Sequence, residues 1–288
     1  MNNKLKLYHA RWSLCSQMVR VALAEKGLSY ESKEIKLADQ YPEAESLSPE
    51  YLKINPKGVV PALDINGEIF TESTHIIKRI NSLVGEKDVN LWPQDVNQKM
   101  LNTWVDDTTL TEGVPLGKTL GTAIPPFSLI LINKMVQKYL SIPQALKVFW
   151  RHPMRDRGRF FLIMKFFNIQ KPVAGRSYKT LARSLLDIEK NLKGPELYFL
   201  GTFSHVDINL MCCLHRLTDV KLEALLDLEE LPRIAAYWSL LKKRPSYKTS
   251  ILDFYGDKEY QDIEDVFGTK DSMHLEPLKK LIKSYSAS

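Results

Sequence analysis

Apolar and polar positions in the first third of the chain follow the periods of a small mixed α/β domain. Residues 5–9 alternate with a period of two, which is typical of a half-buried strand. Residues 15–26 carry apolar side chains at helical spacing and end at Gly27, a residue favoured at helix C-termini. A second extended run is predicted over residues 30–37. The chain therefore opens as strand, helix, strand.

A short helix and a hairpin are predicted next. Residues 48–52 have the composition of a short helix opened by a serine and a proline. Asn66-Gly67 is a strong two-residue hairpin sequence, and it separates the extended runs 60–65 and 68–70. Residues 72–84 return to helical spacing, with apolar residues at Ile76, Ile77, Ile80, Leu83 and Val84. The predicted element order is β-α-β-α-β-β-α.

Beyond residue 92 the pattern becomes helical and predicts no further strands. The Gly- and Pro-rich stretch 113–126 indicates a break between helices, and the stretches 128–150 and 158–168 are strongly apolar but interrupted by Lys and Arg. Ser204 and Asp207 have the spacing of a capping box, although Asp replaces the usual Glu. Further helices are expected over residues 176–193, 208–217 and 231–244.

The length and the change of pattern predict two domains. A chain of 288 residues is long for one domain and ordinary for two. We expect an α/β domain over residues 1–84, a linker over 85–91 and an all-helical domain over 92–255. The charged residues 256–288 are expected to form a C-terminal extension, either two short helices or a mobile tail.

Composition places the chain among globular proteins of a reducing compartment. Apolar residues make up 44% and charged residues 26%, and the three cysteines, Cys15, Cys212 and Cys213, cannot form a disulfide framework. We therefore expect a cytoplasmic protein. The N-terminus lacks the apolar core of a secretion signal, and no stretch approaches the ~18 uncharged apolar residues of a membrane span.

Positive charge is concentrated in the second half. Residues 141–190 hold 11 Lys and Arg against 3 Asp and Glu, whereas residues 1–90 balance at 12 of each. The cluster His152, Arg155, Arg157 and Arg159 allows three interpretations: a solvated face, a site for an acidic or phenolic substrate, or, with the apolar residues beside it, peripheral contact of residues 146–167 with an anionic membrane. No nucleic-acid-binding module accompanies the charge.

Several stretches between about residues 5 and 252 together carry a resemblance to a known family. They are Lys6-Leu7-Tyr8, residues 55–63, Thr71-Glu72-Ser73-Thr74, Ser204 to Asp207, and Trp238 with Arg244-Pro245-Ser246. With a β-α-β-α-β-β-α unit, a proline opening its third strand and a helical domain behind it, the chain resembles the glutathione S-transferase superfamily, whose first domain is thioredoxin-like. It implies an α/β thioredoxin-like N-terminal domain plus an all-α C-terminal domain, glutathione as co-substrate, a role in detoxification and a homodimer.

The subfamily stays open at this stage. Residues 12–16, Trp-Ser-Leu-Cys-Ser, are similar to the start of the first helix in the bacterial glutathione-dependent reductive dehalogenases. Residues 142–159 and the overall length are similar to the lignin β-etherases. The mitochondrial ganglioside-induced differentiation-associated proteins share a similar N-terminal pattern and an enlarged helical domain.

Two kinds of side chain compete for sulfur activation at the start of the first helix. A helix N-terminus carries about half a positive charge, so Cys15 is expected to have a pKa below the free value, with help from Arg11 and Arg20. Alternatively, Cys15 is a small buried hydrophobic residue. Ser13 or Ser16 would instead donate a hydrogen bond to the glutathione sulfur, unless they serve as helix caps.

The resemblance also implies anchors for the rest of glutathione. Val60-Pro61 is expected to be cis and to present the Val60 backbone to the cysteinyl group of the tripeptide. Glu72 and Ser73 begin a helix and would hold the ammonium and carboxylate of the γ-glutamyl group. Lys57 would reach the glycyl carboxylate. The alternative, without a role in binding, is that Glu72 and Ser73 form an ordinary helix start with an acidic residue.

Two function classes follow from these observations. The first is an enzyme that activates the glutathione thiol for attack on a halogenated, aromatic or ether substrate, or for thiol-disulfide exchange. The second is a catalytically weak protein of the same fold that serves as a binding or membrane-associated regulatory module. No metal site is predicted, and Cys212-Cys213 with His215 is expected to be core packing.

Overall fold

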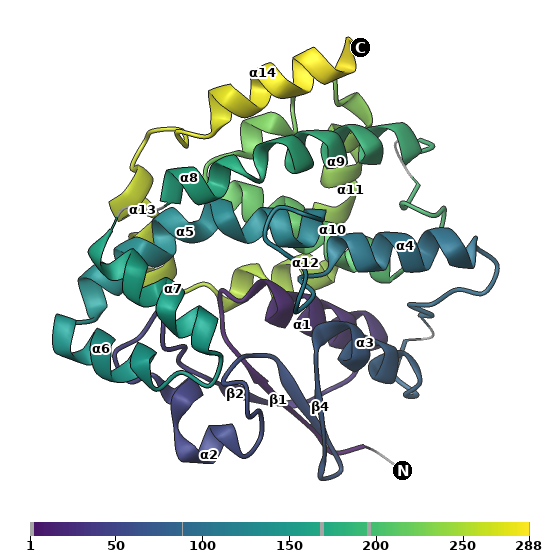
Figure 1. Cartoon of the computed structure of the whole chain (residues 1–288). Helices are drawn as coiled ribbons and strands as arrows, with labels where there is room; N and C mark the ends of the chain where they lie inside the picture. The colour runs from purple at the N-terminus through teal and green to yellow at the C-terminus, as the bar shows by residue number, and fades with distance from the viewer. Residues whose placement is uncertain (1–2, 88, 168–169, 195–196, 288) are drawn as a thin grey trace.

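Four short strands near the N-terminus form one mixed sheet. The computed structural model describes residues 3–87, 89–167, 170–194 and 197–287 (Figure 1). The strands are β1 (Leu5–His9), β2 (Glu31–Glu34), β3 (Ala62–Ile65) and β4 (Glu68–Thr71), in the spatial order β2-β1-β3-β4. β1 pairs parallel with β2 and antiparallel with β3, and β3 pairs antiparallel with β4. The predicted element order along the chain, β-α-β-α-β-β-α, is confirmed.

The hairpin between β3 and β4 has the backbone that its two turn residues predict. Asn66 and Gly67 both lie at positive φ, 56° and 94°, as a type I′ turn requires. The Gly67 N–H donates to Asp64 Oδ1 at 2.6 Å, and the Lys4 N–H donates to Asn66 Oδ1 at 2.9 Å. The turn therefore also ties the start of β1 to the hairpin.

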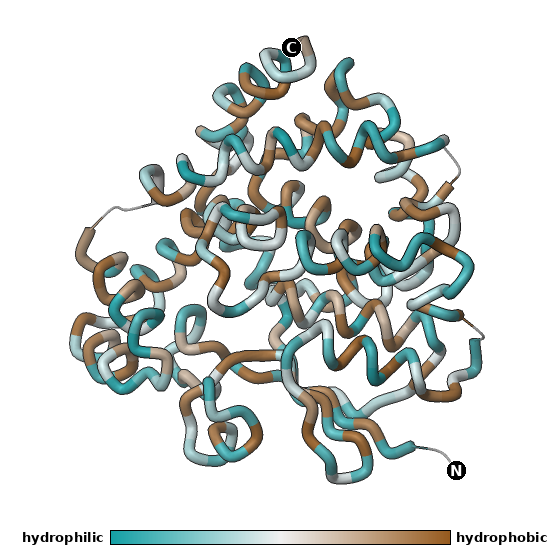
Figure 2. Tube along the Cα trace, turned by 45° about the vertical axis from the view of Figure 1, so that its right-hand side comes forward, coloured by the Kyte–Doolittle hydropathy of each residue, from teal (hydrophilic) through white to brown (hydrophobic). Residues whose placement is uncertain are grey.

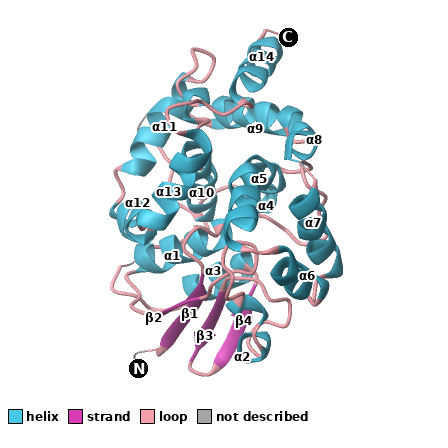
Figure 3. Ribbon diagram, turned by 90° about the vertical axis from the view of Figure 1, so that its left-hand side faces the viewer, coloured by secondary structure: helices cyan, strands magenta, loops and turns pink. Residues whose placement is uncertain are grey.

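Helices α1 and α3 separate the sheet from the helical domain. The helices of this region are α1 (Leu14–Lys26), the 3-10 helix η1 (Glu45–Leu47), α2 (Pro49–Leu52) and α3 (Ser73–Asn81). Figure 3 shows α1 and α3 on the side of the sheet that faces the helical layers, with α2 near the opposite end of the sheet. Gly27 ends α1 at φ 64° as predicted. The helix predicted to reach residue 84 ends at Asn81, and Val84 is 92% exposed because no element covers it.

The second domain is built from helices stacked above the sheet domain (Figure 1). Those preceding the C-terminal extension are α4 (Gln98–Thr108), α5 (Leu120–Tyr139), α6 (Ile142–Trp150), α7 (Arg155–Phe166), α8 (Gln170–Gly175), α9 (Tyr178–Asn191), α10 (His205–Asp219), η2 (Glu223–Leu225), α11 (Pro232–Lys242), α12 (Pro245–Ser250) and η3 (Leu252–Phe254). Hydrophobic segments recur along these helices (Figure 2). Buried side chains of most of them pack with those of α1 in one cluster, whereas those of α6 and α7 form a smaller cluster with part of α5. One continuous apolar core therefore joins both domains.

The prediction of a break over residues 113–126 is only half right. The loop ends at Thr119, and α5 continues through Pro125 and Pro126. A proline has no N–H to donate to the carbonyl of the residue four positions earlier in the helix. The carbonyl of Thr122, which loses its partner at Pro126, instead accepts from the Gly117 N–H at 3.0 Å. Thr119 and Thr122 also close a capping box that holds the helix start.

The capping box predicted at Ser204 and Asp207 is present and buried. One oxygen of the Asp207 carboxylate accepts from the Ser204 N–H at 2.8 Å and from the Ser204 hydroxyl at 2.9 Å. The other accepts from the Phe199 N–H at 2.8 Å and the Tyr237 hydroxyl at 2.6 Å. Asp reaches all these donors although it is one methylene shorter than Glu. The box therefore positions α10, the central helix of the domain.

The described part of the C-terminal extension, residues 256–287, contains two helices, the first of the two alternatives predicted for it. α13 (Asp257–Phe267) packs on α5, and α14 (Leu275–Ser286) packs on α9. Asp262 on α13 is fully buried and pairs with Lys138 on α5 at 3.2 Å. Leu275, Leu278 and Ile282 place the apolar face of α14 in the main core. No helix among the described residues is both long and apolar enough to cross a membrane.

Candidate functional site

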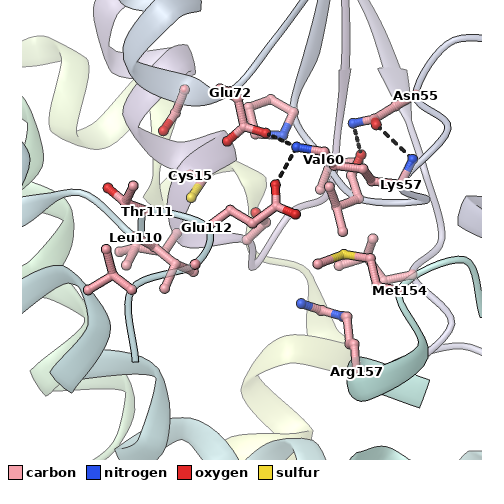
Figure 4. Close-up of a pocket in the computed structure, with 18 residues that line it drawn as sticks. Cys15, Asn55, Lys57, Val60, Glu72, Leu110, Thr111, Glu112, Met154 and Arg157 are labelled. Carbon is pink, nitrogen blue, oxygen red and sulfur yellow. Dashed lines mark hydrogen bonds and ion pairs between the residues drawn. The ribbon is translucent and has the colours of Figure 1, made fainter. Parts of the chain in front are cut away.

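The N-termini of α1 and α3 meet at a cavity of about 310 Å³ between the two domains (Figure 4). Its walls include Ser13 and Cys15 from the start of α1, and Glu72 and Ser73 from the start of α3. Two helix N-termini facing one cavity present several unpaired N–H groups and two positive dipole ends. The cavity is therefore suited to an anionic ligand.

Cys15 lines this cavity. The prediction that the pKa of its thiol is lowered is wrong. Its sulfur is hydrogen-bonded to the Ser73 side chain, which favours the thiolate, and Arg157 and Arg216 act in the same direction. Burial nevertheless dominates and, with the charge of Glu72, raises the pKa of the Cys15 thiol to about 11. At neutral pH Cys15 is a thiol.

Arg11 and Arg20 do not assist Cys15 as expected, because each is committed elsewhere. Arg11 pairs with Glu34 at 2.8 Å, on the side of β2. Arg20 is fully buried and donates to the carbonyls of Ser250 at 2.7 Å and Ala10 at 3.1 Å. Helical spacing turns Arg20 away from the end of α1 that carries Cys15.

Ser13 and Ser16, the rival activators, differ in position. Ser13 caps α1, accepting from the Ser16 N–H at 3.3 Å, and its side chain lines the cavity. Ser16 is fully buried, and its hydroxyl accepts from the Ala10 N–H at 3.3 Å. Ser16 is not among the residues that line the cavity. The structure therefore brings Ser13, and not Ser16, to the site.

The loop before β3 has the predicted cis Val60-Pro61 bond, and both residues line the cavity. Two side chains hold the carbonyl of the preceding residue, Val59. The Tyr51 hydroxyl donates to this carbonyl at 2.7 Å, and the Asn55 amide donates to it at 2.8 Å. Asn55 thus has a positioning role that the sequence analysis did not assign.

Glu72 and Lys57 interact directly across the cavity mouth. Lys57 Nζ lies 2.9 Å from Glu72 Oε1 and also pairs with Glu112, in the loop between α4 and α5 (Figure 4). The hydrogen bonds that Lys57 donates to Glu112 and Glu72 raise the pKa of its ammonium group. Glu72 itself has φ 66°, a left-handed backbone that a side chain rarely adopts. The sequence analysis did not identify Glu112 as a site residue, because it lies in a stretch where apolar residues show no helix or strand periodicity.

A second cavity of about 410 Å³ adjoins the first. The two cavities share five lining residues as a common wall: Ser13, Leu14, Leu37, Leu110 and Arg157. The walls of the second cavity are mainly apolar and come from α5 and α7 together with the start of α1. Ser13 therefore stands where the two cavities meet, whereas Cys15 lines the first alone.

The four residues of the basic cluster, His152, Arg155, Arg157 and Arg159, differ in how deeply they are buried. His152 is buried, and burial together with the charge of Arg157 lowers its pKa to about 4. Arg155 and Arg159 are exposed, as a solvated face predicts, but Arg157 lines both cavities. It was one of several arginines in the sequence, and helical spacing alone did not single it out. Cys212 and Cys213 are buried core residues, as expected.

Family models for glutathione S-transferases match both domains. The model for the N-terminal domain matches residues 7–88, and the model for the C-terminal domain matches residues 146–245. The chain is 26% identical over 262 residues to glutathione S-transferase TCHQD of Arabidopsis thaliana, covering 87% of this chain and 91% of that protein. It is 24% identical over 263 residues to the tetrachloro-p-hydroquinone reductive dehalogenase of Sphingobium chlorophenolicum, covering 86% and 95%.

Solved structures share the fold at low identity. The β-etherase LigF from Sphingobium sp. strain SYK-6 superposes with a TM-score of 0.73 and 20% identity, covering 88% of this chain and all of that one. Identity at this level supports the shared architecture of a thioredoxin-like domain and a helical domain.

Proposed function

From the premise that the chain belongs to the glutathione S-transferase superfamily, we propose that it activates the glutathione thiol for attack on an electrophile held in the second cavity. The observation that carries this proposal is the common wall of the two cavities, with Ser13 at the junction. A thiol bound in the first cavity at this wall would face a substrate in the second. Such placement supplies proximity, a large component of catalysis of a two-substrate reaction.

Ser13 has the hydrogen-bonding capacity that sulfur activation needs. A hydroxyl has one donor and two acceptor positions. The Ser13 oxygen accepts from the Ser16 N–H, and its proton remains to be donated to a thiolate. Helix capping and sulfur activation, alternatives in the sequence, are thus compatible. The positive end of α1 further favours the thiolate.

The remaining anchors for glutathione come from α3 and the loop before β3. Ser73 would donate to the γ-glutamyl carboxylate at the N-terminus of α3, and Glu72 would accept from the ammonium. The Val60 backbone beside Pro61 would pair with the cysteinyl group. Lys57 would exchange one of its carboxylate partners, Glu72 or Glu112, for the glycyl carboxylate.

Titration calorimetry with glutathione tests the first cavity. Ser73→Ala should weaken binding about ten-fold or more, the cost of one hydrogen bond to a charged group. Ser82→Ala, at the exposed opposite end of the same helix, is the matched control and should leave the affinity unchanged. Equal affinity of wild type and Ser73→Ala would remove Ser73 from the site.

The names of the relatives support halogenated aromatic or ether electrophiles as substrates. In either case the sulfur forms a bond to carbon, the bond from carbon to halide or ether oxygen breaks, and the leaving group departs with the electron pair. Thiol-disulfide exchange through Cys15 is the competing chemistry, and it requires the Cys15 thiolate. A panel of chlorinated aromatic, aryl-ether and disulfide substrates distinguishes these reactions.

A second candidate function, membrane association, is favoured by an exposed apolar stripe on α6 and α7. Trp150 is 73% exposed and Phe167 is 66% exposed. Further exposed apolar side chains share the stripe: Ile142, Leu146, Ile163 and Phe166. Exposed basic residues accompany it, namely Lys147, Arg151, Arg155 and Arg159. We propose that this part of residues 146–167, with Ile142, contacts an anionic membrane surface.

Vesicle flotation tests the membrane proposal. Wild type should float with vesicles of phosphatidylcholine and phosphatidylserine but not with phosphatidylcholine alone. Trp150→Ser should reduce flotation, while Val84→Ser, which removes an even more exposed apolar side chain far from the stripe in the sequence, should not. Binding that is the same in both variants would contradict it.

Two further expectations are also carried as proposals. A homodimer would show a mass of about twice 33.1 kDa by light scattering. A reducing, cytoplasmic setting is supported by the free thiols of all three cysteines.

A further inference from the structure

The second cavity contains a buried hydroxyl without a partner. Ser128 lies on α5, is 2% exposed and lines this cavity. Its Oγ makes no hydrogen bond to any described residue. A serine inside a helix ordinarily bonds to the carbonyl four residues earlier or points to solvent, and Ser128 does neither. Buried polar groups are nearly always paired, so this buried hydroxyl keeps an unused donor and unused acceptors beside the cavity.

Arg157 supplies a cation to the same cavity. Its guanidinium has five N–H donors, and one terminal nitrogen lies 3.4 Å from the Asp39 carboxylate. The guanidinium also lies 5.2 Å from the ring centre of Phe161. Within the described part of the chain these are its hydrogen-bond and ring contacts. Figure 4 shows its charged end directed toward the first cavity, and the residue also lines the second. Asp39 thus orients Arg157 without using its remaining donors.

Arg216, the other arginine of this cavity, is not available in the same way. It is buried beneath Trp12, with its guanidinium 3.9 Å from the ring centre, and it donates to the Trp12 carbonyl. Its Nε lies 3.2 Å from Asp219. A ligand anion would therefore meet Arg157 and not Arg216.

We propose that the second cavity selects an apolar, aromatic electrophile that carries an anionic oxygen, with Arg157 and Ser128 holding that oxygen. The aromatic part would pack on the apolar walls, which include Ile124, Leu129 and Phe161. For the reaction of this electrophile with glutathione, the inference rests on the proposed function. For the binding of the electrophile in the second cavity, it does not. Arg157 and Ser128 act here as specificity determinants.

A pair of probe compounds isolates the anionic oxygen. 4-Chloro-3-nitrobenzoate and its methyl ester have the same reactive carbon and nearly the same shape, and differ in charge. With glutathione, the sulfur forms a bond to the carbon that carries chlorine, chloride leaves with the electron pair of the broken bond, and the thiol proton passes to water. Without glutathione the compounds serve as ligands in calorimetry.

Binding without glutathione is the primary measurement. Wild type should bind the carboxylate about ten-fold more tightly than the ester, as expected for a charge-assisted hydrogen bond. Arg157→Met, which keeps an apolar stem against Phe161, should abolish that preference. Ser128→Ala should reduce it, and Arg159→Met, an exposed arginine of the same helix, should preserve it. Equal binding of the two compounds by wild type, or no binding of either, would overturn the proposal.

Kinetics with glutathione give a second, independent readout. The kcat/KM for the carboxylate should fall about ten-fold in Arg157→Met while that for the ester stays within about two-fold. An equal fall in kcat/KM for both compounds would show that Arg157 does not recognise the carboxylate of the probe. A failure of the proposed function would be detected by a different measurement. If that function is wrong, wild type should show no glutathione binding in calorimetry, whichever probe compound it prefers.

Discussion

Ser13 and Cys15 are two residues apart at the start of α1, yet their surroundings differ. Ser13 stands at the junction of the two cavities, and its hydroxyl donates to none of the described residues. Cys15 faces Ser73 inside the first cavity, and burial raises the pKa of its thiol to about 11. A group that must stabilise a thiolate in contact with a second substrate is better placed at Ser13.

The first prediction compares these two residues. Ser13→Ala should lower kcat for thioether formation by about 10²-fold or more, because it removes a hydrogen bond to the developing anion. Cys15→Ser should retain most of that activity. The measurement is steady-state kinetics with a chlorinated nitroaromatic substrate. The reverse pattern, with loss in Cys15→Ser alone, would assign the chemistry to the cysteine.

The second prediction concerns the reactivity of Cys15. Since alkylation follows the thiolate fraction, labelling by iodoacetamide should be slow at pH 7 and should rise until the pH approaches about 11. Ser73→Ala should slow labelling further, because the Ser73 hydrogen bond favours the thiolate. Peptide mapping separates Cys15 from the buried Cys212 and Cys213. Complete labelling of Cys15 at pH 6 would contradict this prediction.

The third prediction uses the backbone of Glu72. A non-glycine residue at φ 66° and ψ 116° is strained by about 1–3 kcal/mol, and glycine is not. Glu72→Gly should therefore be more stable to urea than Glu72→Ala by about 1 kcal/mol. Both variants remove the carboxylate, so both should lose glutathione affinity. If the alanine variant were the more stable one, the strain would be absent.

At the scale of elements, α1 is the helix on which both domains depend. It packs on α3 in its own domain and on α10 and α12 in the other. Glu25, near its C-terminus, is buried and pairs with Arg244, and the Ser246 hydroxyl donates to the same carboxylate. The Arg244-Pro245-Ser246 sequence therefore serves to hold α12 against α1.

The fourth prediction removes one partner of this pair. Arg244→Leu should lower the free energy of unfolding by about 3–5 kcal/mol, because it leaves Glu25 buried and unpaired. Lys242→Leu, which breaks the half-exposed pair with Glu223 at 3.7 Å, should cost less than about 1 kcal/mol. Urea unfolding measures both. Similar small losses in the two variants would show that the buried pair does not hold the domains together.

At the scale of the whole molecule, the continuous core buries most of the histidines. Burial lowers the pKa of His9 and His205 to about 3 and that of His152 to about 4, and it also lowers the pKa of His215. These four are among six histidines in the chain. The folded protein therefore keeps them neutral at pH values where the unfolded chain is protonated.

The fifth prediction follows from this difference. Between pH 6.5 and about 4 the unfolded state binds more protons, so stability falls as the pH falls. The loss is about 2 kcal/mol for each of His9, His152 and His205 between pH 6.5 and 4.5, a large share of a typical domain stability. Thermal unfolding from pH 7.5 to 4.5 measures it. His205→Phe should flatten the pH dependence, and the control His75→Phe, at an exposed site, should not.

The sequence by itself determined the features that depend on neighbouring residues. The Asn66-Gly67 turn, the Gly27 end of α1 and the Ser204-Asp207 cap were predicted correctly, because a turn conformation or a cap is set within about four residues. The same holds for the order of strands and helices in the first domain. Residues 55–63 and 71–74 also identified the family and placed Ser73 and Pro61.

Only the tertiary structure decided the features that depend on distant contacts. In α5, which continues through two prolines, Gly117 replaces the partner that the Thr122 carbonyl loses at Pro126, and Lys57 pairs with Glu112 across 55 residues of sequence. The acidity of Cys15 depends on burial, a sum over atoms from both domains, and Arg157 is selected from its neighbouring arginines by the place where α7 packs. Local spacing contains no information about such distances or about desolvation, which is why these features required the folded chain.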